Sequence, residues 1–187
     1  IDEAADVVTV SHEHSDHNAV DAIKGDFKVL RGLDEETKQA RRFEETIEDV
    51  TFRTVPAYHD DQEGKLRGEN AVFVINTGEI TFVHLGDLGA VLSPEQAEEV
   101  GPVNVLFVPV GGYYTIDASS AKKTVEMIKP DVVVPMHYKT DFIESWPISA
   151  IDDFLTGQES VVMLNANEAE ISQDSLRERR QIWVFDI

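Results

Sequence analysis

His12-Glu13-His14-Ser15-Asp16-His17 decides the fold of this chain, because it places three histidines and one aspartate within six residues. On extended backbone, alternate side chains point to the same side, so His12 and His14 can bind one cation. Where the chain then turns, Asp16 and His17 can face a second cation. A solvated polar loop is the alternative interpretation, and the rarity of this pattern by chance argues against it.

Two further histidines follow predicted strands, which is not how histidines of a protein core are distributed. His59 comes directly after the alternating stretch from Val50 to Tyr58. By itself it also fits a surface loop, so its role stays open on this pattern alone. His137 follows a buried strand beside Pro135, where a lone imidazole needs a partner.

The segment His84-Leu85-Gly86-Asp87 ends the predicted strand from Ile80 to Val83. Gly86 permits the sharp backbone course that would aim Asp87 inward. A carboxylate has two oxygens and can bridge two cations, so we expect Asp87 to do so with a lowered pKa. We expect His84 to bind no metal and to donate a ring N–H to a ligating carboxylate or to substrate. A buried imidazole bonded only to the backbone is the alternative for His84.

Strands and helices alternate along the chain, and the charged stretch from Asp34 to Asp49 predicts an exposed connection or helix. Strands are predicted at Val7 to Val10, Val50 to Tyr58, the hairpin Ala71 to Ile75 with Ile80 to Val83, Val105 to Val108, Val132 to Val134, Val161 to Met163 and Ile182 to Val184. Helices are predicted at Asp16 to Ile23, after Ser93-Pro94-Glu95, at Asp117 to Ile128 and at Ile148 to Leu155. The pattern predicts one α/β domain spanning residues 1–187, with polar groups at strand ends.

The composition constrains the partners. Sixteen Lys and Arg against thirty-six Asp and Glu give a net charge of −20, which repels phosphate backbones. We therefore expect a small-molecule substrate and no nucleic acid. The chain has no cysteine, so imidazole and carboxylate must hold any metal. No apolar run is long enough to span a bilayer, so we expect a cytoplasmic protein without a membrane partner, and an oligomer stays open.

Taken together, the motifs resemble those of the metallo-β-lactamase superfamily, and the stretch from Pro109 to Thr115 is similar to a stand-alone branch that includes sugar-lactone (ascorbate-6-phosphate lactonase-like) hydrolases. They are His12-x-His14-x-Asp16-His17, the lone His59, His84-Leu85-Gly86-Asp87 and Pro135-Met136-His137-Tyr138. The resemblance implies an αββα sandwich with metals at one edge. Several strands precede the first histidine motif in that family, and this sequence begins at Ile1 without a start methionine, so we expect the first strands to be missing.

The resemblance also implies a dinuclear metal site. It assigns His12, His14 and His59 to one ion, Asp16, His17 and His137 to the other, and Asp87 as the bridge. Five imidazoles and two carboxylates suit zinc best, and iron or manganese is also acceptable. Two such ions would lower the pKa of a bridging water towards ~7, which predicts hydrolysis of a small ester, lactone or phosphoester by a metal-bridging hydroxide. Asp16, Asp87 and His84 are the expected catalytic residues.

Beyond the ligands, Tyr114, Tyr138 and Lys139 are candidates for binding substrate, although ordinary loop packing or a solvated side chain is the favoured explanation for each. Asp117 stays open between a helix N-cap and a site residue. Three other functions compete with hydrolysis. A redox di-iron protein would carry a carboxylate at position 14, and a nuclease or phosphodiesterase acting on nucleic acid would need a basic face. A non-catalytic metal-binding protein could keep the same fold, but intact ligands at every motif position argue against a decayed site.

Overall fold

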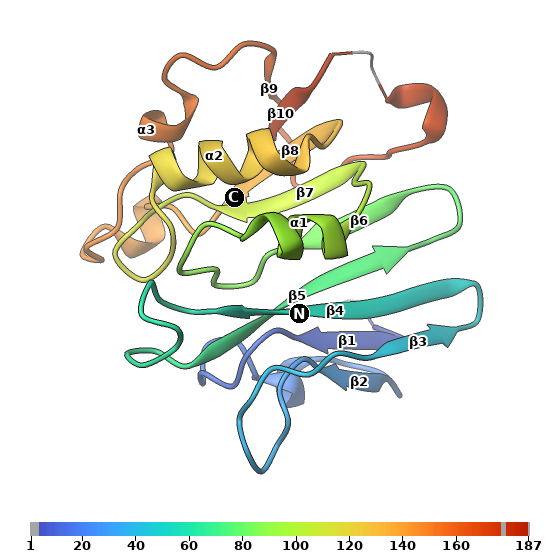
Figure 1. Cartoon of the computed structure of the whole chain (residues 1–187). Helices are drawn as coiled ribbons and strands as arrows, with labels where there is room; N and C mark the ends of the chain where they lie inside the picture. Colours follow the sequence, from blue (N-terminus) through green and yellow to red (C-terminus); the bar gives the residue numbers. More distant parts are fainter. Residues whose placement is uncertain (1–3, 177–178, 187) are drawn as a thin grey trace.

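Two β-sheets form in the part of the chain that the computed structural model describes, residues 4–176 and 179–186. Strands β1 (Val7–Val10) and β2 (Lys28–Arg31) pair in parallel as a small sheet. The large mixed sheet has the strand order β3-β4-β5-β6-β7-β8-β10-β9 (Figure 1). Its strands are β3 (Glu44–Ile47), β4 (Val50–Tyr58), β5 (Glu69–Asn76), β6 (Thr81–His84), β7 (Val105–Pro109), β8 (Val132–Met136), β9 (Val161–Met163) and β10 (Gln181–Val184).

Short helices connect these strands, and α1 and α2 lie over one face of the large sheet (Figure 1). The α-helices are α1 (Pro94–Val100), α2 (Ala118–Ile128) and α3 (Asp152–Leu155), and the 3-10 turns are η1 (Val20–Ala22), η2 (Asp141–Ile143) and η3 (Gln173–Ser175). Helix α1 begins at the capping box of Ser93 and Gln96, as the Ser93-Pro94-Glu95 signal predicts. Among the described helices, none has both the length and the apolar character needed to cross a bilayer.

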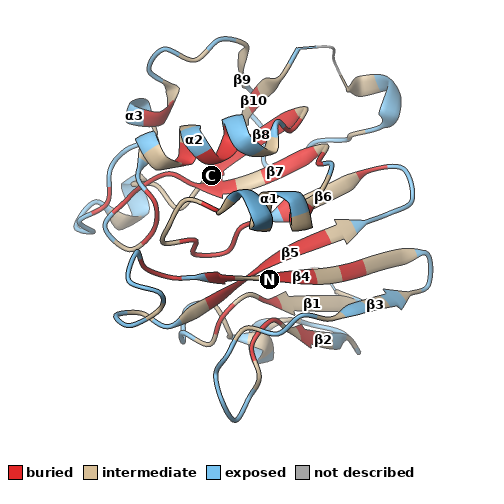
Figure 2. Ribbon diagram, viewed as in Figure 1, coloured by how far each residue is buried: buried red, intermediate tan, exposed pale blue. Residues whose placement is uncertain are grey.

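Strand β5 is buried along most of its length (Figure 2), and its side chains alternate between two layers of the core. Val72 and Val74 face the main core, which also contains residues of α1 and α2. Ala71 and Phe73 face the opposite way and pack in a second cluster with residues that include Leu30 and Leu33. The helices therefore cover one face of the large sheet and the small sheet covers part of the other.

The small sheet packs closely on β5, and this contact sets the position of the first histidine motif. The Ala71 N–H donates to the Ser11 carbonyl at 2.9 Å. A Cβ added to Gly32 would lie 2.3 Å from the Ala71 Cβ, so no larger residue fits there without displacing the sheets. The α/β layered architecture expected from the sequence is thus confirmed, with the loop after β1 held against the large sheet.

Most predicted strands are confirmed, whereas two predicted helices are wrong or too long. Between Asp16 and Ile23 the structure has only η1, because the Asn18 side chain bonds the Glu13 carbonyl at 3.2 Å and favours turns over a helix. The helix expected from Ile148 is confined to α3. The chain before it is pinned, since the Ser149 N–H donates to the Gly111 carbonyl at 2.7 Å.

The charged stretch from Asp34 to Asp49 is not purely a connection, because it contains β3, and β2 was not predicted at all. Strand β3 lies at the edge of the large sheet, with Glu44 and Thr46 exposed. Charged side chains are common on edge strands, where they oppose pairing with another chain. Periodicity cannot recognise such a strand, since its apolar face is too short.

Candidate metal centre

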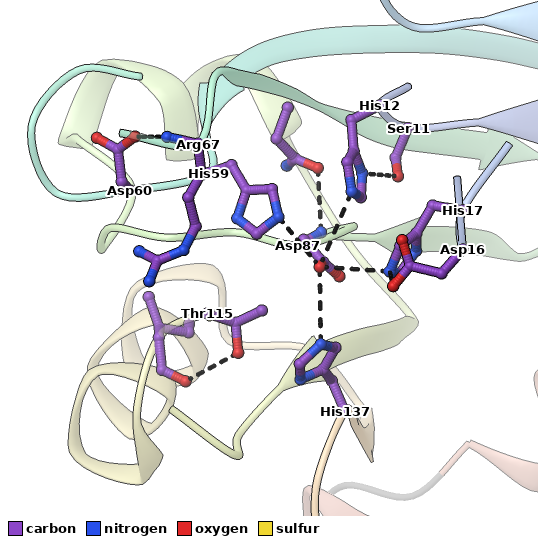
Figure 3. Close-up of polar contacts among 12 residues, drawn as sticks. Ser11, His12, Asp16, His17, His59, Asp60, Arg67, Asp87, Thr115 and His137 are labelled. Carbon is purple, nitrogen blue, oxygen red and sulfur yellow. Dashed lines mark hydrogen bonds and ion pairs between the residues drawn. The ribbon is translucent and has the colours of Figure 1, made fainter. Parts of the chain in front are cut away.

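The predicted ligands meet at one edge of the sandwich, and each follows the end of a strand. The histidine motif follows β1, His59 follows β4, Asp87 lies three residues after β6, and His137 follows β8. Strands β4, β6 and β8 belong to the large sheet, with one strand between each successive pair, and the loop after β1 is packed against that sheet. Their ends therefore bring residues far apart in sequence into one place. Figure 3 shows His12, His17, His59 and His137 around Asp87.

One oxygen of Asp87 is the centre of the cluster. Its Oδ2 lies 3.2 Å from the Nε2 of His59, 3.4 Å from that of His17, 3.6 Å from that of His137 and 3.9 Å from that of His12 (Figure 3). Four imidazoles from four separate loop positions thus point the same ring nitrogen at one carboxylate. A hydrogen-bonded protein core does not need such convergence, whereas cation binding does.

Within the cluster, donor atoms form two groups that could each hold a metal ion. One group is His12, His14 and His59, and the other is His12, His17 and Asp87, with the donor atoms of each group within 4.8 Å of one another. Asp16 lies beside the second group, since its Oδ2 is 3.6 Å from the His17 Nε2. The structure therefore brings together all seven residues that the sequence suggests as ligands. Their division between two ions stays a prediction.

The buried ring nitrogens fit a cation. The His12 ring is 2% exposed, and its Nδ1 lies 3.0 Å from the Ser11 Oγ, which leaves Nε2 without a hydrogen bond although it faces the cluster. His59 and His137 each also keep one buried nitrogen, Nδ1, without a partner. Because buried polar atoms in folded proteins are normally partnered, an unpaired donor atom aimed at other ligands fits metal coordination.

The protonation states suit metal binding at neutral pH. Burial raises the pKa of Asp87, but the hydrogen bond from His59 and the nearby histidines outweigh it and bring the pKa to about 2. Burial lowers the pKa of His12 to about 3. Burial, and then His59, also lower the pKa of His14. An ionised carboxylate beside neutral imidazoles is the form in which these groups bind metal.

A residue that the sequence patterns did not indicate, Asn70, holds Asp87 in place. Asn70 is fully buried on β5, and its Oδ1 accepts the Asp87 N–H at 3.0 Å while its Nδ2 donates to the Leu85 carbonyl at 2.9 Å. Gly86 lies between these bonds with φ of 57°, and a Cβ there would lie 2.3 Å from the Asn70 Oδ1. Only a buried amide in a strand could have suggested this role, and that signal is weak.

His84 belongs to neither donor group. Its expected donation of a ring N–H to a ligating carboxylate or to substrate stays a prediction. Its Nδ1 accepts the Gly86 N–H at 3.0 Å, and its ring lies beside Phe107 with centroids 5.8 Å apart. The bond to the backbone agrees with the alternative interpretation, but His84 is exposed and not the buried imidazole which that interpretation assumed. Because the bond closes the turn before Asp87, His84 supports the position of that carboxylate.

The cluster opens into a cavity of about 330 Å³. Arg67, Tyr114 and Trp146 form its other walls, so Tyr114 is placed beside the ligands, whereas Arg67 and Trp146 were missed by the sequence patterns. Tyr138 and Lys139 do not line this cavity. The Tyr138 ring packs against the main core, and the Lys139 N–H donates to the Ser149 carbonyl at 2.9 Å.

Asp117 caps a helix. Its side chain accepts the Ser120 N–H at 2.8 Å, and α2 begins at the next residue. The hydrogen bond from Ser120 holds the pKa of Asp117 below its usual value. The alternative that the sequence left open, a site residue, finds no contact with the ligand cluster among the interactions of the described residues.

The chain is similar to known proteins in both sequence and structure. A family profile described as "Beta-lactamase superfamily domain" matches residues 1–137. A UPF0173 metal-dependent hydrolase of Pyrococcus furiosus is 32% identical over 187 aligned residues, covering 89% of this chain and 81% of that protein. A UPF0173 metal-dependent hydrolase of Carboxydothermus hydrogenoformans is 29% identical over 165 residues, covering 79% of this chain and 71% of that protein.

Among solved structures, one from Thermotoga maritima superposes with a TM-score of 0.78 at 36% identity, covering 97% of this chain and 82% of that one. That protein is described as "a putative zn-dependent hydrolase of the metallo-beta-lactamase superfamily".

Proposed function

We propose that this chain, which belongs to the metallo-β-lactamase superfamily and within it to the UPF0173 metal-dependent hydrolase family, hydrolyses a small ester, lactone or phosphoester with two divalent metal ions. Its α/β sandwich of a mixed sheet and helices is the metallo-β-lactamase fold that the motifs predict. Metal-dependent hydrolysis is the activity for which its relatives are named. The number of ions, their identity as zinc and the substrate class are our proposal.

The observation that carries the proposal is the convergence of four Nε2 atoms on Asp87 Oδ2. His12, His14 and His59 would hold one ion, Asp16, His17 and His137 the other, and Asp87 would contact both. When bound, such ions supply an activated water and polarise the oxygen of a carbonyl or phosphoryl group. The donor set of imidazole and carboxylate is one that zinc accepts, as are iron and manganese.

The side chains around the ions would divide the remaining work. Asp87 is 5% exposed and ionised, so it would offset the mutual repulsion of two bound cations. Asp16 lines the cavity with a side chain that is 60% exposed, so it can accept a proton during the reaction and pass it to solvent. His84 and Asn70 keep the turn before Asp87 in place through its backbone.

The cavity and the charge limit the substrate to small molecules. A volume of about 330 Å³ is near the lower end of the ~300–1,000 Å³ typical of ligand sites. The net charge of −20 disfavours long polyanions such as RNA and DNA. A sugar lactone, the substrate type of the branch that the sequence resembles, is one candidate within these limits.

Metal analysis with a substrate panel tests the proposal. We expect the purified protein to carry close to two transition-metal ions and to lose its turnover of esters, lactones or phosphoesters on chelation. Readdition of zinc should restore turnover. A well-folded protein that binds no metal at neutral pH, or one that cleaves oligonucleotides and none of the small substrates, would refute it.

A further inference from the structure

The loop between β4 and β5 is rigidly built and delivers one arginine to the cavity. At its start, the Asp60 carboxylate is 2% exposed and accepts four backbone N–H groups. The donors are Gln62 at 2.8 Å, Gly64 at 3.0 Å, Leu66 at 2.9 Å and Arg67 at 2.7 Å. The last bond fixes the backbone of Arg67 itself, from which its side chain extends.

From there, the Arg67 side chain reaches past His59 toward the segment of Thr115 (Figure 3). Its guanidinium lies 5.8 Å from the centre of the Tyr114 ring, and that ring lies 6.5 Å from the His137 ring. Tyr114 also contacts Trp146, with ring centroids 6.0 Å apart. Arg67 thus lies one aromatic ring away from the metal ligands, on the wall of the same cavity.

The charge of Arg67 is not neutralised by a carboxylate. The surface arginines Arg31, Arg42 and Arg180 each pair with a glutamate, as expected in a chain with thirty-six acidic residues. Arg67 has no ion pair with any residue in 4–176 or 179–186. A cation that stays free in an acidic protein, inside a cavity and on a fixed loop, is suited to bind an anionic ligand.

We propose, on the basis of the proposed hydrolase function, that Arg67 binds an anionic group of the substrate, a carboxylate or a phosphate, while the scissile bond lies at the metal ligands. A guanidinium presents parallel N–H donors that match the two oxygens of either group. Tyr114 and Trp146 form the walls between the two ends. The substrate class is therefore a small anionic ester, lactone or phosphoester, recognised at one end by Arg67 and hydrolysed at the other.

Matched substrates distinguish this role from simple packing of Arg67 on Tyr114. Each pair contains the same ester or lactone with a free carboxylate and with that carboxylate methylated. In Arg67→Gln we expect KM for the anionic member to rise about 10- to 100-fold, the loss typical of a charge-assisted hydrogen bond, with kcat little changed. Turnover of the neutral member should stay constant. Arg67→Lys should recover only part of the loss, because an ammonium lacks the planar fork.

Arg41→Gln is the control, because Arg41 also lies over an aromatic ring, 5.7 Å from the centre of Phe43, and does not line this cavity. It should leave KM for both members unchanged, and metal content should be equal in all variants. Equal preference for both members in the natural protein, or a preference that survives Arg67→Gln, would overturn the inference and leave metal-dependent hydrolysis standing.

A binding measurement separates the inference from the proposed function. Trp146 lines the cavity, so its fluorescence in the metal-loaded protein should respond to inorganic phosphate or to a small dicarboxylate, and Trp146→Phe identifies its share of the signal. We expect Arg67→Gln to weaken this binding about 10- to 100-fold. The stronger of the two ligands tells which anion the site prefers. Binding that depends on Arg67 without turnover of any substrate would refute the hydrolase and retain the anion site, whereas binding independent of Arg67 would refute the site.

Discussion

The inner wall of the cavity and its mouth are held in different ways. The inner wall is formed by proposed ligands, of which His59 is 2% exposed and Asp87 is fixed by bonds from β5 and by its own turn. The equally buried His12 does not line the cavity but lies 3.9 Å from the Asp87 Oδ2. The mouth is formed by side chains that are not proposed ligands, Arg67 and Tyr114 together with Trp146, which is 40% exposed on a loop. Changes on the inner wall should therefore alter metal binding, and changes at the mouth should alter substrate preference.

Among changes on the inner wall, Asp87→Ala should have the largest effect on metal binding and activity. It removes the one oxygen that four histidines share, so we expect metal content to fall and hydrolysis to be abolished. Elemental analysis and turnover on the same preparation measure both. Asp153→Ala, an exposed change on α3, is the control. If Asp87→Ala kept full metal content, the inner wall would not depend on its central carboxylate.

Asn70→Ala tests whether the inner wall depends on groups that touch no metal. The change leaves the Leu85 carbonyl and the Asp87 N–H without partners, which should cost about 1–3 kcal/mol of unfolding free energy. We also expect metal affinity to drop ~10–100-fold, as for other residues that support ligands. Competition with a chelating dye measures affinity, and denaturant unfolding measures stability.

Asn76→Ala is the matched control for that experiment, because Asn76 lies exposed on the same strand and bonds Thr81 and Gly78 at the β5–β6 turn. It should leave metal affinity unchanged. A stability loss in Asn70→Ala with unchanged metal affinity would reduce Asn70 to a packing role and remove it from the site.

The sequence patterns identified the inner wall much better than the mouth. Metal binding requires histidine and carboxylate at restricted spacings, so His12, His14, Asp16 and His17 could be recognised together, and strand ends indicated His137. Arg67 and Trp146 carry no such signal, because any loop can present a side chain to a cavity. Their position depends on tertiary contacts such as the Asp60 bonds, which no local pattern contains.

The fold shows the same limit. Strands with a continuous apolar face, such as β4 and β7, were predicted close to their observed bounds. The edge strand β3 was not recognised, because its charged side chains hide the apolar alternation of a strand. Only its position at the edge of the sheet explains those charges. The predicted helix from Asp16 was wrong because side-chain bonds within the histidine loop compete with helical ones.

Asp60→Asn should weaken substrate binding at the mouth of the cavity and leave metal binding at the inner wall unchanged. One oxygen of Asp60 accepts the backbone N–H groups of Leu66 and Arg67. An asparagine NH2 group in its place would face these two N–H donors and could accept neither. We expect KM for anionic substrates to rise several-fold with metal content unchanged, and a loss of about 1–3 kcal/mol in unfolding free energy at pH 7. Metal loss in this variant would show that the loop also supports the ligands.

The pH dependence of that stability loss has a defined sign. Burial raises the pKa of Asp60, but the four backbone donors outweigh it and hold the pKa below its usual value. A depressed carboxyl pKa stabilises the fold above the pKa of the unfolded chain, ~3.9, and the stabilisation is lost as pH falls through the folded-state pKa. The difference in unfolding free energy between the natural protein and Asp60→Asn should therefore be largest near neutral pH and shrink in acid.

Asp117→Ser should have the smallest effect, and it tests whether Asp117 belongs to the mouth of the cavity. Serine keeps an oxygen that can accept the Ser120 N–H, so we expect metal content, KM and stability to stay close to those of the natural protein. Asp117→Ala removes the cap and should cost about 0.5–2 kcal/mol of unfolding free energy while leaving metal content unchanged. Thermal unfolding and turnover of both variants make the comparison. Asp117 lies beside Gly112 and directly precedes α2, whose residues Ala121 and Val125 pack in the main core. A cap defect therefore weakens the helix without moving the ligands. A collapse of turnover in Asp117→Ser with stability intact would instead place Asp117 in the mouth beside Tyr114.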